Sequence, residues 1–240
     1  MRLNHLNPKN PFARVMTQRL ISLVPELNAD PSITAVILWG GLDRSFSVGG
    51  DFRDISALKT EPEMAEYLLE IIDLYVALLR IERPVVAAID HHAIGQGLQV
   101  ALCADWRVAT HRTAVSMPEL QNGVACPLGS LLLEVLLGRS RMMQAVIGCE
   151  SFDSVGARDF GLLNELVAPP DELWKFAHQR ATRLAGFHAV PFSATKRIHN
   201  QRLIDQLDAI RGPAAAAHVA SISARANAPH FEKILGPARG

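Results

Sequence analysis

The feature that most restricts the fold is a strand-like run that leads through a glycine turn into an apolar helix. Residues 84–105 read PVVAAIDHHAIGQGLQVALCAD. The run Val85–Ile89 is apolar throughout, which is typical of a strand covered on both faces of its sheet. After Gly97, LQVALCA predicts a helix that ends at Asp105, and WRVAT (106–110) predicts a further strand. A strand, a turn, a helix and another strand in this order indicate an α/β core.

The rest of the chain continues this alternation. Residues 17–27 have helical spacing, and residues 33–39 (ITAVILW) predict a second strand covered on both faces. A long helix is predicted from about residue 62 to residue 79, and LLLEVLLG predicts a buried helix with Gly138 as its C-cap. From Asp171 onward three helical stretches follow one another. The predicted fold class is therefore α/β with a C-terminal helical segment.

Composition excludes several classes of function. The 240 residues are 49% hydrophobic and 20% charged, and their formal net charge is zero with the basic residues scattered. A protein that binds nucleic acid through a broad basic surface is not expected from this balance. The N-terminal residues show no apolar signal region, and no stretch is long and apolar enough to cross a membrane. Three widely spaced cysteines predict buried free thiols in a reducing compartment, so a cytoplasmic location is expected.

Two glycine turns share one construction, because each lies between an apolar strand and a helix. The first contains Gly49 and Gly50, and the second is Gly95-Gln96-Gly97. Amides at the first turn of a helix have no internal partner, so one N–H from each turn can together bind an oxygen that becomes negative. Glycine-rich turns also occur wherever a chain simply has to turn tightly, and the second turn is no dinucleotide fingerprint. Glu119 likewise fits either a first-turn carboxylate that complements the helix dipole or a catalytic residue.

Three segments in this order resemble the crotonase (enoyl-CoA hydratase/isomerase) superfamily. They are AVILWGGLDRSFSVGGDF, RPVVAAIDHHAIGQGLQVALCADWRVAT and MPELQNGVACPLGS, and the resemblance extends from about residue 3 to residue 167. It implies a spiral core of repeated ββα units over residues 1–170, and a helical segment over residues 171–240 that completes the site and mediates trimers or hexamers. It also implies a coenzyme A thioester as substrate, with no metal and no permanently bound cofactor.

The resemblance implies roles for individual residues. The backbone amides of Gly50 and Gln96 form the oxyanion hole for the thioester oxygen, and the Gln96 side chain makes the pocket wall bulkier than the commoner glycine does. Glu119 matches the second of the two glutamates of enoyl-CoA hydratases, whereas the first falls on Gln99, an amide that cannot transfer a proton at neutral pH. The residues expected to contact the substrate are Val48, Gly49, Asp51 and Phe52, with Pro8 and Lys9 near the adenine or phosphates.

Several short motifs of the chain are similar to those of a narrower branch of the superfamily, the carboxymethylproline synthases. These motifs include NPKNPFAR, IDLYVALL and ARANAPHFEKILG. The branch implies decarboxylation of malonyl-CoA to an enolate, attack on the cyclic imine pyrroline-5-carboxylate, and hydrolysis of the new thioester. Gln99 and Glu119 match its pattern, and His230 matches a histidine that holds the carboxylate of the acceptor.

Two other functions stay open from the sequence. One is a different crotonase reaction, such as decarboxylation, hydration or isomerisation of another acyl-CoA. The other is a non-catalytic or RNA-binding relative, against which the zero net charge speaks. The identity of the acceptor, the stereochemistry and the choice between trimer and hexamer are not determined by these residues.

Overall fold

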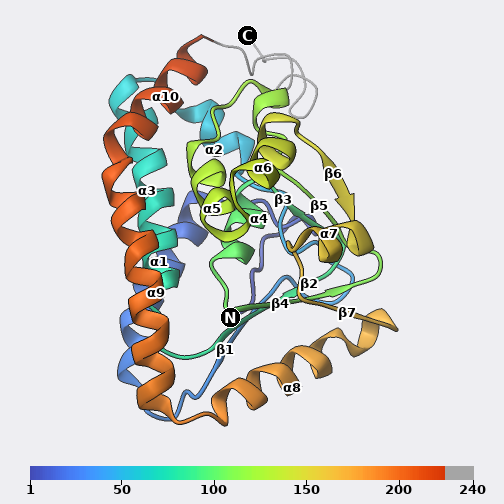
Figure 1. Cartoon of the computed structure of the whole chain (residues 1–240). Helices are drawn as coiled ribbons and strands as arrows, with labels where there is room; N and C mark the ends of the chain where they lie inside the picture. The colour runs from blue at the N-terminus through green and yellow to red at the C-terminus, as the bar shows by residue number, and fades with distance from the viewer. Residues whose placement is uncertain (225–240) are drawn as a thin grey trace.

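A computed structural model describes residues 1–224, and its centre is a four-stranded parallel sheet (Figure 1). The strand order is β1-β2-β4-β7, with β2 and β4 in the middle. The five residues of β2 are all buried, as expected for a strand covered on both faces. The predicted strands at Val85–Ile89 and Trp106–Thr110 are confirmed with the same bounds. The strands of this sheet are β1 (Val36–Trp39), β2 (Val85–Ile89), β4 (Trp106–Thr110) and β7 (Glu165–Val167).

Strand β1 differs from the prediction in its start and in its burial. It begins at Val36 rather than at residue 33, and its residues are alternately buried and half-buried. Val36 pairs with Val85, and the Val36 N–H donates to the carbonyl of Pro84. Because Pro84 has no N–H to donate in return, the ladder ends there. The opposite edge of β1 is paired with the N-terminal residues, where Leu3 N–H donates to the Trp39 carbonyl at 2.8 Å.

The chain also forms a second sheet, which has three strands. Its order is β3-β5-β6, in which β3 and β5 are parallel and β6 is antiparallel to β5. Ser47 forms an isolated parallel bridge with Ala93, so the segment after β1 joins the edge of this sheet. In the first three turns the chain adds a strand to the four-stranded sheet, then an extended segment to the second sheet, and then a helix, whereas β6 joins the second sheet before α7 (Ser154–Phe160) and β7 follow. The repeated turns confirm the predicted spiral of ββα units. The strands are β3 (His92–Ile94), β5 (Ala114–Ser116) and β6 (Ser151–Asp153).

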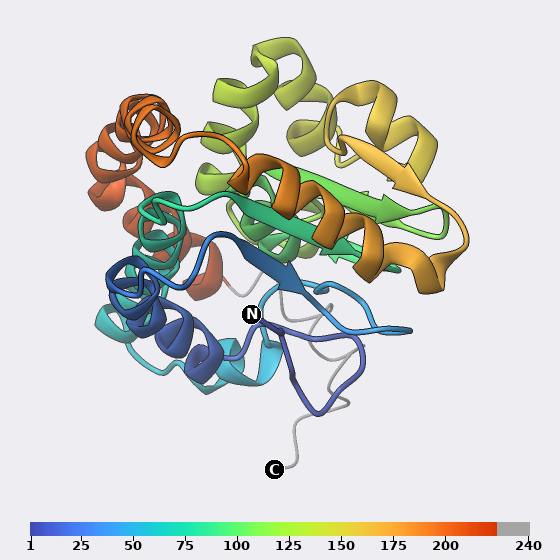
Figure 2. The same cartoon turned by 90° about the horizontal axis from the view of Figure 1, so that it is seen from below.

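Helices cover the two sheets as separate layers. Helix α8 lies across one face of the four-stranded sheet, where Leu173 and Ala177 pack on Val86 and Val108 (Figure 2). Beside the sheets, α3 packs against α1, α9 and α10 (Figure 1). The helices are α1 (Arg14–Ala29), α2 (Phe52–Ala57), α3 (Glu61–Leu79), α4 (Gln96–Leu102), α5 (Pro127–Leu137), α6 (Arg139–Met142), α7 (Ser154–Phe160), α8 (Leu173–Ala185), α9 (Ala189–Ala209) and α10 (Arg211–Ser223), with short helical turns at Leu120–Asn122, Met143–Ile147 and Pro170–Glu172.

Helix α3 carries two tyrosines toward the centre of the molecule. It begins at a capping box in which Thr60 Oγ1 accepts from the Glu63 N–H and a Glu63 carboxylate oxygen accepts from the Thr60 N–H. This box explains why the helix starts within one residue of the predicted position. Tyr67 and Tyr75 lie on its buried face. The helix therefore positions two phenol groups beside the site described below.

Helix α5 is less buried than predicted. Gly138 is its C-cap, as expected, with φ of +85°. However, Val135 and Leu136 are about two-fifths exposed, at 41% and 42%, while Leu132 and Leu133 are fully buried. One face of this apolar helix therefore packs into the core, and its other face is exposed on the surface of the described residues.

The C-terminal helices are tied to the rest of the chain by polar contacts as well as by packing. Lys196 on α9 donates to an Asp105 carboxylate oxygen at 2.6 Å and to the carbonyl of Arg83 at 2.8 Å. The three predicted helical stretches after Asp171 are confirmed as α8, α9 and α10. The three cysteines are free and buried. Among residues 1–224, no helix combines the length and apolarity needed to span a bilayer.

Candidate active site

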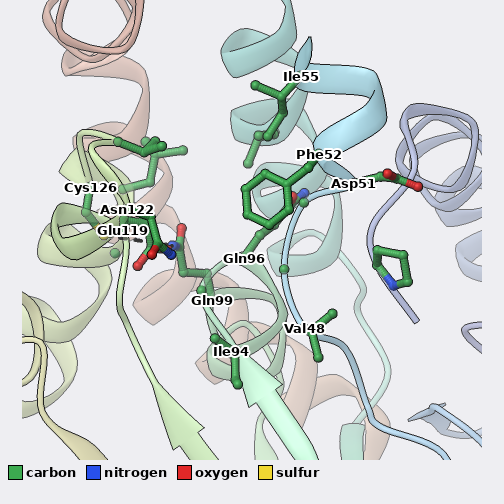
Figure 3. Close-up of a pocket in the computed structure, with 18 of the residues that line it drawn as sticks. Val48, Asp51, Phe52, Ile55, Ile94, Gln96, Gln99, Glu119, Asn122 and Cys126 are labelled. Atoms are coloured by element: carbon green, nitrogen blue, oxygen red, sulfur yellow. Dashed lines mark hydrogen bonds between the residues drawn. The ribbon is translucent and has the colours of Figure 1, made fainter. Parts of the chain in front are cut away.

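A cavity of about 680 Å³ lies where the two glycine turns meet helix α3 and the segment around Glu119 (Figure 3). Glu119, Asn122 and Cys126 lie on one side of it, and Val48 and Phe52 lie on the other. Nine residues that the sequence indicated for the site line this one cavity: Lys9, Val48, Gly49, Gly50, Asp51, Phe52, Gln96, Gln99 and Glu119. The cavity is large enough for a small-molecule site.

The first glycine turn uses its backbone amides on protein partners, with one exception. Ser47 N–H donates to the His92 carbonyl, Val48 N–H to the Lys9 carbonyl, and Gly49 N–H to Ser47 Oγ. Two residues after Gly49, the Asp51 N–H donates to the carbonyl of Phe12. Gly50 N–H donates to no group among residues 1–224, although its residue lines the cavity. The turn therefore presents one backbone donor to a ligand.

The second turn presents another. Gly95 adopts φ of +55° and ψ of −126°, a conformation open essentially to glycine alone, and its N–H donates to the Ser116 carbonyl. Gln96 N–H has no acceptor within the described part of the chain. This nitrogen lies 3.6 Å from the position that a Cβ on Gly49 would take, so the two turns are in contact. Two unpaired N–H groups from separate loops thus border one cavity, an arrangement that can stabilise an oxygen as it becomes negative.

Gly97 is the residue that allows this contact. A Cβ added to it would lie 2.5 Å from the backbone oxygen of Ser47 and 2.8 Å from the Ser47 Cβ. That same oxygen accepts from the Ile94 N–H at 3.0 Å. Only a residue without a side chain lets the start of α4 approach the first turn this closely.

A chain of side-chain hydrogen bonds fixes the carboxylate of Glu119. The Tyr75 hydroxyl donates to Gln99 Oε1 at 2.9 Å, and Gln99 Nε2 donates to Glu119 Oε1 at 2.7 Å. Tyr75 is fully buried, and Gln99 is nearly so. Because the tyrosine occupies the amide oxygen, the amide nitrogen must face the carboxylate. Glu119 follows Pro118 and stands just before the short helical turn at Leu120–Asn122.

The two oxygens of Glu119 therefore differ. Oε1 is held by Gln99, whereas Oε2 is buried and has no hydrogen-bond partner among residues 1–224. Burial raises the pKa of Glu119, and the hydrogen bond from Gln99 acts in the opposite direction. Such a carboxyl group is suited to exchange a proton through Oε2 with a molecule in the cavity.

Replacing Tyr75 by phenylalanine tests this hydrogen-bonded chain. The change removes one hydroxyl and leaves Gln99 Oε1 buried without a donor, which costs about 1–3 kcal/mol in the free energy of unfolding. Gln99 is then free to turn its oxygen toward Glu119, so we expect the pKa of Glu119 to rise and the acid limb of the pH–rate profile to move to higher pH. Urea unfolding and turnover of an acyl-CoA substrate across pH measure the two effects. An unchanged profile would remove Tyr75 from the arrangement of the site.

Other expected contact residues have different surroundings. Asp51 lines the cavity, but its Oδ1 accepts from the Arg53 N–H as the N-cap of α2, and its Oδ2 lies 3.5 Å from His5 Nε2. Pro8 is absent from the described lining of the cavity, and its carbonyl accepts from the Ser45 N–H. His230 lies outside the described residues.

Sequence reasoning missed His218 on α10. Its side chain lines the cavity, is only 3% exposed, and has no partner among the described residues on either ring nitrogen. Burial lowers its pKa to about 4, so the imidazole is neutral at pH 7. Its ring stacks on that of Tyr67 with centroids 6.1 Å apart. The available signal was helical spacing, since His218 shares a buried face with Ala214 and Ile222.

Known proteins share the sequence pattern and the fold of this chain. Residues 1–226 match the family described as Enoyl-CoA hydratase/isomerase. A carboxymethylproline synthase from Pectobacterium carotovorum subsp. carotovorum is 36% identical over 98% of this chain and 93% of its own length. Among solved structures, ThnE from S.clavuligerus is 32% identical, with a TM-score of 0.77 over 90% of this chain and 99% of that one. An enoyl-CoA hydratase from Bacillus halodurans, at 20% identity and a TM-score of 0.86 over 97% of this chain and 94% of that one, shares the fold.

Proposed function

The chain belongs to the enoyl-CoA hydratase/isomerase family, and we propose that it forms a carbon–carbon bond as a carboxymethylproline synthase does. Malonyl-CoA is decarboxylated to an enolate, the enolate attacks pyrroline-5-carboxylate, and the resulting thioester is hydrolysed. The observation that carries this proposal is that two unpaired backbone N–H groups, at Gly50 and Gln96, border the same cavity as the Glu119 carboxylate, which Gln99 holds.

The first step needs stabilisation of negative charge and no base. When the bond between the free carboxylate and C2 of malonyl-CoA breaks, its electron pair forms the enolate and CO₂ departs. The charge collects on the thioester oxygen, where the N–H groups of Gly50 and Gln96 bind it more strongly than they bind the neutral carbonyl. A site with two neutral donors and one carboxylate set apart suits this step.

The later steps use Glu119. Pyrroline-5-carboxylate reacts as its N-protonated iminium: C2 of the enolate bonds to the imine carbon, and the π pair of the C=N bond becomes the lone pair of the ring nitrogen, which keeps its proton. Water then attacks the thioester carbonyl, Glu119 Oε2 takes a proton from that water, and the coenzyme A thiolate leaves. Because Oε1 is held by Gln99 and Oε2 has no described hydrogen-bond partner, this proton transfer is assigned to Oε2, which must become accessible to the attacking water.

Gln99 supports this reaction over ordinary hydration of an enoyl-CoA. Hydration with paired acids requires a second group that transfers a proton, and an amide does not do so at neutral pH. Here Gln99 donates to Glu119 and is held in that orientation by Tyr75. The 36% identity to a carboxymethylproline synthase across nearly the whole chain supports the same choice.

His218 is a second candidate for the role that the sequence suggested for His230, which lies outside the described residues. Its side chain borders the cavity, and its two buried ring nitrogens have no described hydrogen-bond partner, so the imidazole suits the carboxylate of the acceptor. A carboxylate beside the ring raises the pKa of His218 above the low value that burial alone gives, and the pair becomes charge-assisted. The acceptor thus lies between α10 and the enolate carbon.

The coenzyme A portion of the bound substrate is proposed to extend from the thioester through the open side of the cavity. Lys9 and Arg53 line that cavity and are exposed, so their charges can pair with phosphates in solvent. Val48, Gly49 and Phe52 border the path to the thioester. A homotrimer or hexamer, a cytoplasmic location and the division at about residue 170 remain part of this proposal.

Product analysis tests the proposed function directly. Purified protein, malonyl-CoA labelled with ¹³C at C2 and pyrroline-5-carboxylate are expected to yield carboxymethylproline that carries the label, together with free coenzyme A. Mass spectrometry detects both products, and acetyl-CoA in place of malonyl-CoA serves as the control that offers no CO₂ to lose. If neither this imine nor others of a cyclic imine panel give a labelled product, the proposed function is wrong.

A further inference from the structure

A second set of polar groups faces the cavity from the wall opposite Glu119. Gln96 is only 8% exposed, and its Nε2 is buried without a hydrogen-bond partner among residues 1–224. Tyr67 is 4% exposed, and in the same part of the chain its hydroxyl makes no hydrogen bond. Burial raises the pKa of Tyr67, so its hydroxyl stays a neutral donor. Donors left unpaired at this depth are costly unless a ligand satisfies them.

The Tyr67 hydroxyl and the amide oxygen of Gln96 lie beside Gly50, while Gln96 Nε2, on the same carboxamide, is buried. A Cβ placed on Gly50 would lie 3.1 Å from the Tyr67 hydroxyl and 3.3 Å from Gln96 Oε1. The same position lies 3.4 Å from Ile55 Cδ1, and Leu68 and Ile71 line the wall nearby. The two polar groups therefore sit in an otherwise apolar wall, within a few ångströms of the place where a thioester carbonyl would bind.

The charge of the wall restricts what can bind there. The Lys and Arg side chains that line the described cavity are Lys9 and Arg53, and both are exposed rather than deep in the site. Near Gly50 the donors are neutral. Neutral donors can seat a carboxylate without forming a buried ion pair, which would oppose the loss of its charge as CO₂ departs.

We propose that the Tyr67 hydroxyl and the Gln96 carboxamide, turned so that Nε2 takes the place of Oε1 toward Gly50, form a subsite for the free carboxylate of a malonyl-type thioester. They are specificity-determining residues that select a dicarboxylic acyl-CoA over a monocarboxylic one. The inference rests on the proposed function, and it concerns the Gln96 side chain rather than the Gln96 backbone amide. In a malonyl thioester the free carboxylate is two bonds from the carbonyl carbon, a separation that the two neighbouring subsites accommodate.

The test compares affinities for stable analogues in which NH replaces the thioester sulfur. Calorimetry with the malonyl and acetyl amide analogues of coenzyme A gives the selectivity ratio, which is the dissociation constant of the acetyl analogue divided by that of the malonyl analogue. Gln96→Met keeps the backbone N–H and nearly the same length, and we expect it to weaken binding of the malonyl analogue by about 10- to 100-fold relative to the acetyl analogue. Tyr67→Phe is expected to lower the same ratio by about tenfold or less, and it serves as the second variant if Gln96→Met folds poorly.

Gln206→Met on α9 is the matched control. Its Oε1 is also buried without a described partner, but the residue does not belong to the described lining of the cavity. The ratio is expected to stay at the wild-type value in this variant. A wild-type ratio in both Gln96→Met and Tyr67→Phe would overturn the inference, as would a change confined to the KM for pyrroline-5-carboxylate. If the wild-type ratio is high and depends on Gln96 but no carboxymethylproline forms, the proposed function fails while this inference stands.

Discussion

Glu119→Gln is expected to slow hydrolysis of the product thioester by about 10²- to 10⁴-fold while malonyl-CoA decarboxylation stays within about tenfold of wild type. An amide cannot take a proton from water, whereas the decarboxylation step depends on the N–H groups of Gly50 and Gln96. The variant should therefore accumulate carboxymethylprolyl-CoA. Mass spectrometry measures the thioester, and a thiol reagent measures the release of coenzyme A.

The pH dependence gives this prediction a second readout. Burial raises the pKa of Glu119 above its usual value, so in wild type the hydrolysis rate falls as the pH decreases through that raised pKa, because the protonated carboxyl cannot act as a base. In Glu119→Gln this limb should disappear. Glu134→Gln is the matched control, since Glu134 lies on α5 with its side chain 45% exposed and 3.9 Å from Arg139. Equal loss of decarboxylation and hydrolysis would contradict the separate roles.

Gly97→Ala is expected to lower kcat/KM by about 100-fold and the free energy of unfolding by about 1–3 kcal/mol. The added methyl group would lie 2.5 Å from the Ser47 backbone oxygen, which is already held by the Ile94 N–H. Since that oxygen cannot retreat without breaking the contact between the two loops, α4 has to move instead. This movement separates the N–H groups of Gly50 and Gln96, which the proposed function requires at one thioester oxygen.

Gly212→Ala on α10 controls for the general effect of removing a glycine from a helix. Gly212 is exposed, and an added Cβ would meet nothing within 4 Å. This variant is expected to keep wild-type activity and to gain up to about 1 kcal/mol in the free energy of unfolding. Steady-state kinetics and urea unfolding of both variants measure the contrast. Wild-type kcat/KM in Gly97→Ala would mean that close contact between the loops is not needed.

Elements with strong local signals could be predicted from the sequence. The two central strands were assigned correctly because strands buried on both faces are continuous apolar runs. The strands of the second sheet, of three residues each, are too short to show a periodicity and were not predicted. The exposed side of α5 was also missed, because an all-apolar run does not reveal which of its faces the rest of the chain covers.

The candidate site divides in the same way. The turns of Gly50 and Gln96 could be identified because glycine and the start of a helix leave backbone amides without local partners, and Glu119 could be identified by its motif. Tyr67, Tyr75 and His218 could not, because each is an ordinary residue of a helical face until another part of the chain packs on it. Their chemistry depends on neighbours that are distant in sequence.

By itself, the sequence determined which backbone and side-chain groups are available: two glycine turns with orphan amides, one acid at residue 119 and an amide at residue 99. Only the tertiary structure decided that the two amides border one cavity, that Gln99 holds Glu119 Oε1 while Oε2 is buried without a described hydrogen-bond partner, and that Gln96, Tyr67 and His218 line the same cavity. The physical reason is the distance along the chain between the residues that determine each property. Turn geometry and helix starts are set by neighbouring residues, whereas burial, pKa and convergence on a single point arise from packing between distant segments.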